Sequence, residues 1–242
     1  MRRLLAPAVA VLALCLCAAD GASGQGTKGH KPARTKDASR HSKAAADAFN
    51  SIMRVRDKAI PKDLLENAEA VAVFPGVLKA AFIVGGRKGQ GVISRRTPQG
   101  WSAPVFYNMS GGSIGFQAGG SKTDYVLLIM NEDGLKGLLE DKFEIGGEAG
   151  VAAGPVGRTL AASTTPTLDA GILSYSRSKG VFAGASIKGV AITPDNDLNR
   201  AYYGRTAREV LTSGQRPPTL VRSLPLAISR YSDRRAAPAP KK

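Results

Sequence analysis

One serine of this sequence stands in a pattern that hydrolytic enzymes use. Gly111-Gly-Ser-Ile-Gly fits the G-x-S-x-G arrangement, in which the central serine, here Ser113, is the nucleophile. That chemistry needs a histidine base and a turn from strand to helix. The sequence has only two histidines, His30 and His41, and both lie in a segment that we predict to be unfolded. Because the residues after Gly115 alternate as in a strand, we interpret the segment as a glycine-rich strand and predict no catalytic residue.

Two further patterns resemble sites for a metal ion or a phosphate. Asp195-Asn-Asp resembles the start of a calcium loop, but the glycine and the distant glutamate of such a loop do not follow. Capping of a helix by Asp195 explains this pattern better. The glycines of Gly85–Gly91 are not followed by the Lys-Ser/Thr of a P-loop, and the residues after them have a strand pattern. The sequence therefore predicts no metal site and no cofactor.

Basic side chains form two clusters that fit the phosphate groups of a lipid surface. The first lies on and beside the first predicted helix and consists of Arg54, Arg56, Lys58 and Lys62. The second consists of Arg87 and Lys88, at the tip of a predicted hairpin, with Arg95 and Arg96 at the far end of the returning strand. Each Lys or Arg near an anionic surface contributes at most about 1 kcal/mol. A charged turn and a helix that packs onto its own domain are the alternative interpretations.

The first of these clusters belongs to an amphipathic helix predicted over residues 44–60. Phe49, Ile52 and Val55 recur with alanines at three- and four-residue spacing, as on one face of a helix. Ile60-Pro61 ends the pattern, because proline disfavours helical geometry in the residue before it. An amphipathic helix with basic flanks can lie in a membrane interface, or it can bury its apolar face in its own domain. Both interpretations stay open at this point.

Glycines dominate the stretch that follows. Of 28 glycines, 23 lie between Gly76 and Gly204, interleaved with apolar and β-branched residues in many short strand patterns. Glycine within a strand marks a bulge, a bend or a close approach of two backbones. Helical patterns gather before and after this stretch. We therefore predict an α+β fold, with a strongly bent, barrel-like antiparallel sheet and flanking helices at its N- and C-terminal ends.

The two ends of the chain differ in character from this central part. Residues 1–24 have the basic start and apolar run of an export signal, which contains both cysteines, Cys15 and Cys17. We expect an exported protein of the periplasm or envelope, with lipid attachment at Cys17 as a weaker alternative. Residues 25–43 are predicted to be a disordered basic tail and residues 214–242 a basic tail rich in Pro and Arg, leaving residues 44–213 as the domain. These tails carry most of the formal net charge of +15.

Six phrases in a fixed order give the sequence a family resemblance. They are Ala70-Val-Ala-Val-Phe-Pro-Gly, the glycines of Gly85–Gly91, Trp101-Ser-Ala-Pro, Gly111-Gly-Ser-Ile-Gly-Phe-Gln-Ala-Gly, Asp124-Tyr-Val-Leu-Leu-Ile-Met-Asn and Asn199-Arg-Ala-Tyr-Tyr-Gly. Together they resemble the SYLF domain family over about residues 44–213. The resemblance implies a lipid-binding module for phosphoinositides or other anionic lipids and not an enzyme. It also implies that an amphipathic N-terminal helix, at the position of Phe49, Ile52 and Val55, engages the bilayer, and that some members bind actin.

Two hypotheses for the function follow. In the first, the protein binds anionic phospholipid at a membrane surface, through the two basic clusters and the amphipathic helix. In the second, it is an envelope module that binds a protein or the cell wall through a sheet edge and the C-terminal tail, in which Leu220–Ile228 is an apolar patch. No specific nucleic-acid partner is expected.

Overall fold

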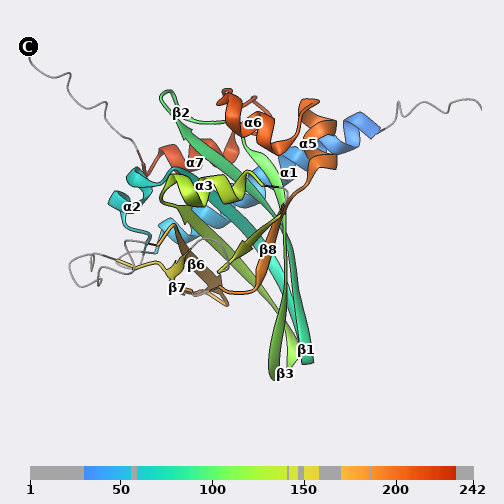
Figure 1. Ribbon diagram of the computed structural model, residues 1–242, viewed down its shortest axis with the longest axis vertical. Coiled ribbons are helices and arrows are strands. Elements are labelled where there is room, and N and C mark those ends of the chain that lie inside the picture. Colours follow the sequence, from blue (N-terminus) through green and yellow to red (C-terminus); the bar gives the residue numbers. More distant parts are fainter. Residues whose placement is uncertain are drawn as a thin grey trace, which may run out of the picture.

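The computed structural model describes residues 30–55, 59–140, 142–146, 150–157, 170–185 and 187–232, without the side chains of residues 30–32, 80–84 and 113–119. The predicted signal of residues 1–24 lies outside these ranges. Figure 1 shows a bent sheet with helices gathered at one end of it. Among the described residues, no helix is long and apolar enough to cross a membrane.

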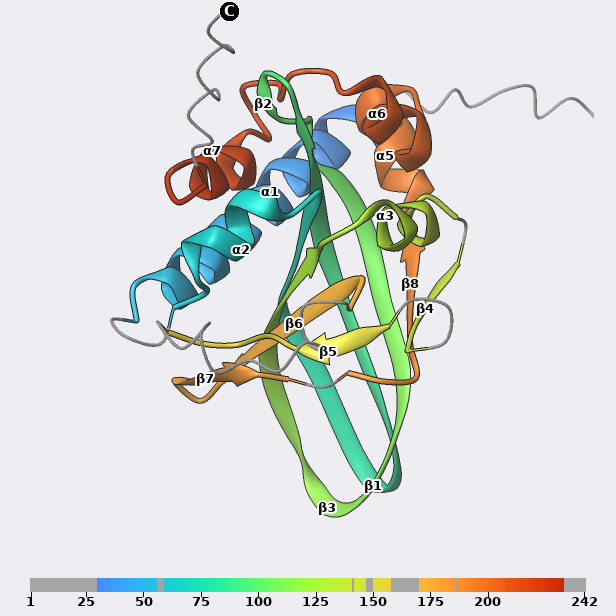
Figure 2. The ribbon, with the colours of Figure 1, turned by 60° about the vertical axis from the view of Figure 1, so that its left-hand side comes forward.

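Two long antiparallel strands form the centre of the fold. Strand β1 spans Ala70–Thr97 and strand β3 spans Val105–Ile129. They pair along almost their whole length, from Ala70 opposite Ile129 to Ile93 opposite Val105, with two shifts of register on the way. The short strand β2, Gly100–Trp101, pairs with the end of β1. Both long strands run away from the helices, bend, and return, as Figure 2 shows.

Glycines, which carry no side chain, allow the two arms of this bent ribbon to meet. A Cβ on Gly91 would overlap the ring of Phe74, and a Cβ on Gly89 would come too close to Val77. Gly91 itself is buried. The bend therefore requires glycine at these positions, as the sequence predicted for its glycine-rich strands.

Shorter strands complete a sheet of eight strands among the described residues. Their bounds are Phe143–Ile145 for β4, Val151–Ala153 for β5, Ile172–Ser178 for β6, Val181–Gly184 for β7 and Val190–Pro194 for β8. Strand β6 pairs with the returning arm of β3, and β8 pairs with its first arm. Every pairing is antiparallel except that of β5 with β6. The predicted α+β class and the bent, barrel-like sheet are confirmed.

The helices cover the sheet in two groups. Helices α1 (His30–Met53), α2 (Lys62–Asn67) and α7 (Ser223–Ser229) pack on the outer face of the ribbon. Helices α3 (Glu132–Leu138) and α6 (Ala207–Ser213) pack against the inner face, and α5 (Asn196–Tyr203) lies beside the start of α1. Alternation along β1 divides the core accordingly: Val71 and Val73 face outward to α1, and Ala72 and Phe74 face inward.

Helix α1 begins well before residue 44, where the sequence predicted the domain to start. The predicted disorder of residues 25–43 is therefore corrected for residues 30–43. Ala38 and Ser42 are fully buried, and the Ser42 hydroxyl donates a hydrogen bond to the carbonyl oxygen of Val221 beside α7. Two small residues let the helices approach closely, and a bond to a residue 179 positions away has no signature in the local sequence.

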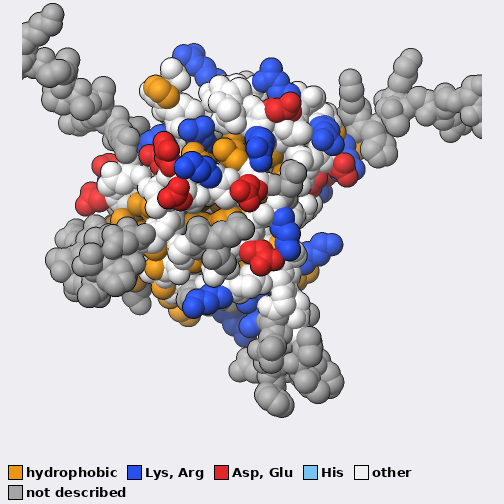
Figure 3. All heavy atoms as spheres, viewed as in Figure 1, with side chains coloured by type: hydrophobic (Ala, Val, Ile, Leu, Met, Phe, Trp, Pro, Cys, Tyr) orange, Lys and Arg blue, Asp and Glu red, His pale blue; other side chains and the backbone are white. Residues whose placement is uncertain are grey.

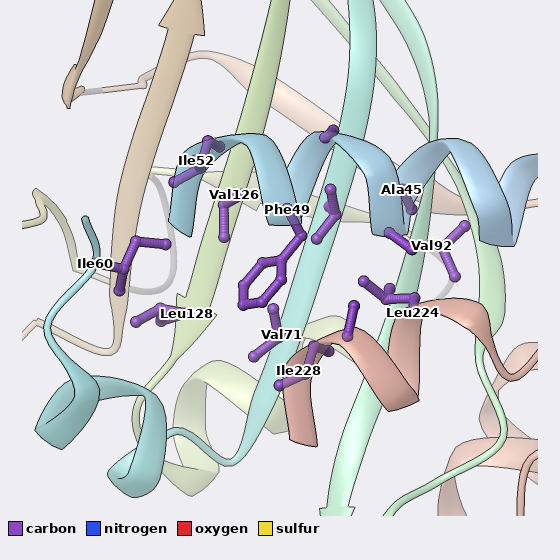
Figure 4. Packing of buried hydrophobic residues seen from close by; sticks show 14 of the residues in the cluster. Ala45, Phe49, Ile52, Ile60, Val71, Val92, Val126, Leu128, Leu224 and Ile228 are labelled. Atoms are coloured by element: carbon purple, nitrogen blue, oxygen red, sulfur yellow. The ribbon is translucent and has the colours of Figure 1, made fainter. Parts of the chain in front are cut away.

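The C-terminal segment also belongs to the fold, up to Ser232. Leu224, Ala227 and Ile228 of α7 are buried against α1, beside Phe49 (Figure 4). The indole nitrogen of Trp101 donates to the hydroxyl of Ser232 at 3.1 Å. The predicted tail of residues 214–242 is thus corrected for residues 214–232, whose apolar patch docks on the core.

Candidate functional site

A groove of about 820 Å³ lies between the first half of α1, strand β1 and the start of α5. We call it the α1–β1 groove. Its charged and polar lining consists of Arg34, Arg40 and His41 from α1, Lys88 and Gln90 from β1, Asn108 from β3, and Asp195 and Asp197 from the start of α5. Leu78 of β1 also lines the groove and is 55% exposed. A large apolar side chain in this position is available to a ligand.

The bend of the ribbon creates the floor of this groove. Leu78 lies on the outgoing arm of β1, and Lys88 and Gln90 lie on the returning arm. They line one hollow because β1 folds back on itself, with Gly89 against Val77. The glycines thus position the floor, while side chains around them supply the chemistry.

Buried hydrogen bonds hold α5 in place as one wall. The Asn199 side chain accepts from the backbone nitrogen of Phe106 at 3.0 Å and donates to its carbonyl oxygen at 2.9 Å. It therefore pairs with β3 much as a strand residue would. The Tyr203 hydroxyl donates to the Pro104 carbonyl, and burial raises the pKa of this hydroxyl, so that it stays a donor. The phrase Asn199–Gly204, which the sequence singled out, has a structural role here.

Asp195 is fixed at the top of the same wall. As predicted, it caps α5, because its Oδ1 accepts a hydrogen bond from the backbone nitrogen of Leu198 at 3.0 Å. Its Oδ2 accepts from the side-chain amide of Gln90 at 3.5 Å. Asp197, in the first turn of α5, is exposed. The carboxylates of this wall are therefore placed by the helix start.

The groove holds charges of both signs. Arg40 makes an ion pair with Asp37 of its own helix at 2.8 Å. Burial lowers the pKa of the neighbouring His41, and the positive charge of Arg40 lowers it further. Among the described residues, no ion pair joins the basic side chains of α1 and β1 to Asp195 or Asp197. On the face drawn in Figure 3, basic and acidic side chains are likewise interspersed over the helical end.

Of the six predicted lipid-binding residues that the structure describes, one, Lys88, lines this groove. The predicted hairpin tip at Arg87 and Lys88 is wrong: both lie in the interior of β1, opposite Gly111 and Ser110. The turn instead follows Thr97 at the end of β1. A turn was predicted there because strand patterns lie on both sides of the glycines. The glycines instead belong to one continuous, bent strand. Arg87 is half-buried in that strand.

Arg95 and Arg96 lie near the turn, and Arg96 has a structural role. Its guanidinium donates to the carbonyl oxygens of Leu65, at 2.5 Å, and Ala68, at 2.8 Å, which ties α2 to the sheet. It also stacks over the ring of Trp101, 4.3 Å from the centroid. Arg95 is half-buried. Two of the guanidinium nitrogens of Arg96 thus face protein carbonyls, while its contact with lipid stays a prediction.

The residues predicted on the amphipathic helix are not part of the groove. Phe49 and Ile52 are fully buried, and Val55 is half-buried. The predicted membrane contact by Phe49 and Ile52 is corrected for this folded state, because they fill the space between α1, the sheet and α7 (Figure 4). Arg54 is exposed at the far end of α1, and Lys62 is exposed on α2. Arg56 and Lys58 lie outside the described residues.

Sequence reasoning missed Arg34, Arg40 and His41. Arg34 and His41 are seven residues apart, which is two helical turns, so they share a face of α1. This spacing was visible in the sequence. The sequence nevertheless predicted disorder for residues 25–43, because they contain no large apolar residue, the usual evidence for an ordered helix.

A second groove, of about 360 Å³, lies beside α7. We call it the α7 groove. It is lined by Trp101 of β2, Arg216 and Pro217 from the link before α7, Arg222, and Leu226 of α7. Leu226 is 48% exposed. No acidic residue is found among the described residues that line it.

Comparison with known proteins gives the family. A family model described as "Ysc84: Las17-binding protein actin regulator" matches residues 110–231. "LAS seventeen-binding protein 3" of Saccharomyces cerevisiae is 39% identical over 171 residues, 68% of this chain and 37% of that protein. The chain belongs to the Ysc84 (SYLF) family. "SH3 domain-containing YSC84-like protein 1" of Xenopus laevis is 30% identical over 210 residues, which cover 84% of this chain and 62% of that protein.

The family match covers only part of each relative and only part of each groove. The chain covers less than two thirds of the length of each of these Ysc84-family relatives. The matched residues 110–231 include Asp195, Asp197 and the part of the α7 groove from Gly214 onward, but not its lining residues between Thr97 and Trp101. They leave out Arg34, Arg40 and Lys88, the basic wall of the α1–β1 groove.

Proposed function

We propose that this protein is a non-enzymatic module that binds the headgroup of an anionic phospholipid in the α1–β1 groove. The observation that carries the proposal is the meeting of Arg34, Arg40 and Lys88 around an open hollow beside the exposed Leu78. Cationic side chains suit a phosphate, and Leu78 suits the apolar part of a lipid. The site differs from the one predicted on residues 54–62, and it shares Lys88 with the second predicted cluster.

The expected strength of this binding is modest. Each Lys or Arg near an anionic surface contributes about 1 kcal/mol. Three such groups therefore give at most about 3 kcal/mol from charge, part of which Asp195 and Asp197 offset. Salt should weaken the interaction, because exposed charges are screened over about 10 Å at 0.1 M. The basic residues of 25–43 other than Arg34 and Arg40 would add a non-specific attraction.

Neutralising the basic wall should weaken binding to vesicles. Lys88→Gln and Arg40→Gln are each expected to lower the affinity for phosphatidylglycerol vesicles by about fivefold. Both side chains are exposed, so the fold should be retained. Vesicle co-sedimentation of the purified chain measures the effect.

Arg208→Gln is the matched control for this experiment. Arg208 is exposed on α6, outside the groove, and its replacement removes the same charge. Equal losses in all three variants would mean that net charge alone matters, and the groove would be wrong. Unchanged binding in Lys88→Gln and Arg40→Gln would have the same consequence.

A second candidate function is protein binding at the α7 groove. Arg216 and Arg222 flank an apolar lining of Trp101, Pro217 and Leu226, and no acidic residue is among the described residues of this groove. This combination fits an acidic segment that carries an apolar side chain. The yeast relative is named for binding another protein, which supports this candidate. This candidate corresponds to the second hypothesis from the sequence, in which a protein binds at a sheet edge and the C-terminal segment.

Charge reversal in the α7 groove should abolish capture of such a partner. The double change Arg216→Glu and Arg222→Glu is expected to lower the yield of a partner cross-linked from a cell extract by about tenfold. The control is Arg208→Glu with Arg230→Glu, which changes the charge equally at two exposed positions outside the groove. A partner retained by the first variant and lost by the control would contradict the assignment.

We also propose that the protein is exported to the periplasm or envelope. The apolar run and basic start of residues 1–24 support export to the periplasm or envelope. Mass spectrometry of the mature N-terminus tests this directly, including attachment of lipid at Cys17.

A further inference from the structure

Opposite charges face one another across the α1–β1 groove. Arg34, Arg40 and Lys88 belong to the α1 and β1 walls, and Asp195 and Asp197 to the α5 wall. Among the described residues, no ion pair links the two sides, so the groove keeps charges of opposite sign apart. A site built for negative charge alone would not place two carboxylates in its lining.

The acidic wall is held rigidly. Asp195 is fixed by its hydrogen bonds to Leu198 and Gln90. Asp197 follows on the first turn of α5, which Asn199 anchors to β3. His41, next to Arg40 in α1, also lines the groove. A ligand that fills the groove therefore meets cations on one side and acceptor oxygens on the other.

This arrangement discriminates between headgroups. A headgroup with acceptor oxygens only gains from the basic wall but is repelled by the carboxylates. A headgroup that also carries a hydrogen-bond donor gains from both walls, since ionised carboxylates only accept hydrogen bonds. We propose that the α1–β1 groove selects anionic headgroups that carry a donor group, an ammonium or a hydroxyl, in addition to their phosphate.

This inference rests on the proposed function and adds the class of headgroup. The shared chemistry is a phosphate with a donor a few bonds away. A phosphoserine headgroup supplies an ammonium and a phosphoglycerol headgroup supplies hydroxyls. Phosphatidic acid has the phosphate without such a substituent, so it serves as the comparison lipid.

The test compares three kinds of phosphatidylcholine vesicle, which contain phosphatidylserine, phosphatidylglycerol or phosphatidic acid and are matched for surface charge. The unmodified chain should bind vesicles with at least one of the two donor lipids about threefold to tenfold more tightly than those with phosphatidic acid. Asp197→Asn should remove that preference and strengthen binding to phosphatidic acid, because it removes the repelling charge. A preference for phosphatidylserine alone identifies the ammonium, and one for phosphatidylglycerol identifies the hydroxyls.

Glu132→Gln is the matched control, because Glu132 is an exposed acid in the first turn of α3, outside the groove. It should leave the preference unchanged. Equal binding to all three vesicles, or a preference that survives Asp197→Asn, would overturn the inference. If binding is equal but still falls in Lys88→Gln, the proposed function stands without the selectivity. If Lys88→Gln changes nothing, both fail.

Discussion

Phe49→Ala is expected to lower the free energy of unfolding by about 3–5 kcal/mol. Phe49 is fully buried in α1, with its ring 6.0 Å from that of Tyr231 in an edge-on arrangement. It fills the space between α1, the sheet and α7 (Figure 4). Removing the ring loses its transfer free energy and leaves a cavity, because the surrounding residues relax only partly. Such a loss is a large part of the roughly 5–15 kcal/mol that stabilises a typical domain.

Urea unfolding followed by circular dichroism measures this effect without any lipid. Leu78→Ala is the contrasting variant, since Leu78 is 55% exposed in the α1–β1 groove. It should change stability little but weaken binding to vesicles. The opposite pattern, a stable Phe49→Ala variant that no longer binds vesicles, would mean that α1 turns its apolar face to the membrane. That result would contradict the packing seen here and restore the interpretation that the sequence left open.

Gly91→Ala is expected to destabilise the protein by about 1–3 kcal/mol or more. A Cβ at this buried position would overlap three ring atoms of Phe74, across the fold of the bent ribbon. Phe74 is itself fully buried, so its ring has little room to move. The strand arms must then separate or the ring must leave its place, and either change disturbs the inner core.

Gly112→Ala is the matched control on the partner strand. Gly112 is exposed in β3, and a Cβ there would meet no atom within 4 Å. Its replacement should be neutral or slightly stabilising, because alanine has less freedom to lose on folding. Thermal or urea unfolding of both variants gives the comparison. Equal stability of Gly91→Ala and the unmodified chain would show that the two arms do not approach as closely as described.

Several elements could be predicted because their signals are local. Ala70–Phe74 and Tyr125–Ile129 are continuous apolar runs of the length of a buried strand, and both lie in the core as expected. Asp195 caps α5 because its side chain reaches a backbone nitrogen three residues on. The glycines indicated a bent sheet correctly. Each of these statements needs only neighbours along the chain.

The candidate site was harder to predict, because its residues come from distant segments. Lys88 joins Arg34 and Arg40 only once β1 bends and α1 crosses it. Arg87 and Lys88 were predicted at a hairpin tip, because a glycine-rich turn and a glycine-rich bend have the same composition. Arg96 looked like a free surface charge, and only the fold supplies the carbonyls of Leu65 and Ala68 that it binds.

The sequence by itself determined the fold class, the glycine-dependent bend and the family resemblance. Tertiary structure decided that residues 30–43 are helical and that a groove forms beside them. The physical reason is that this segment buries only small side chains, such as Ala38 and Ser42, which carry no strong local preference. Its order comes from contacts such as that of Ser42 with Val221, and such contacts exist only when the whole chain has folded.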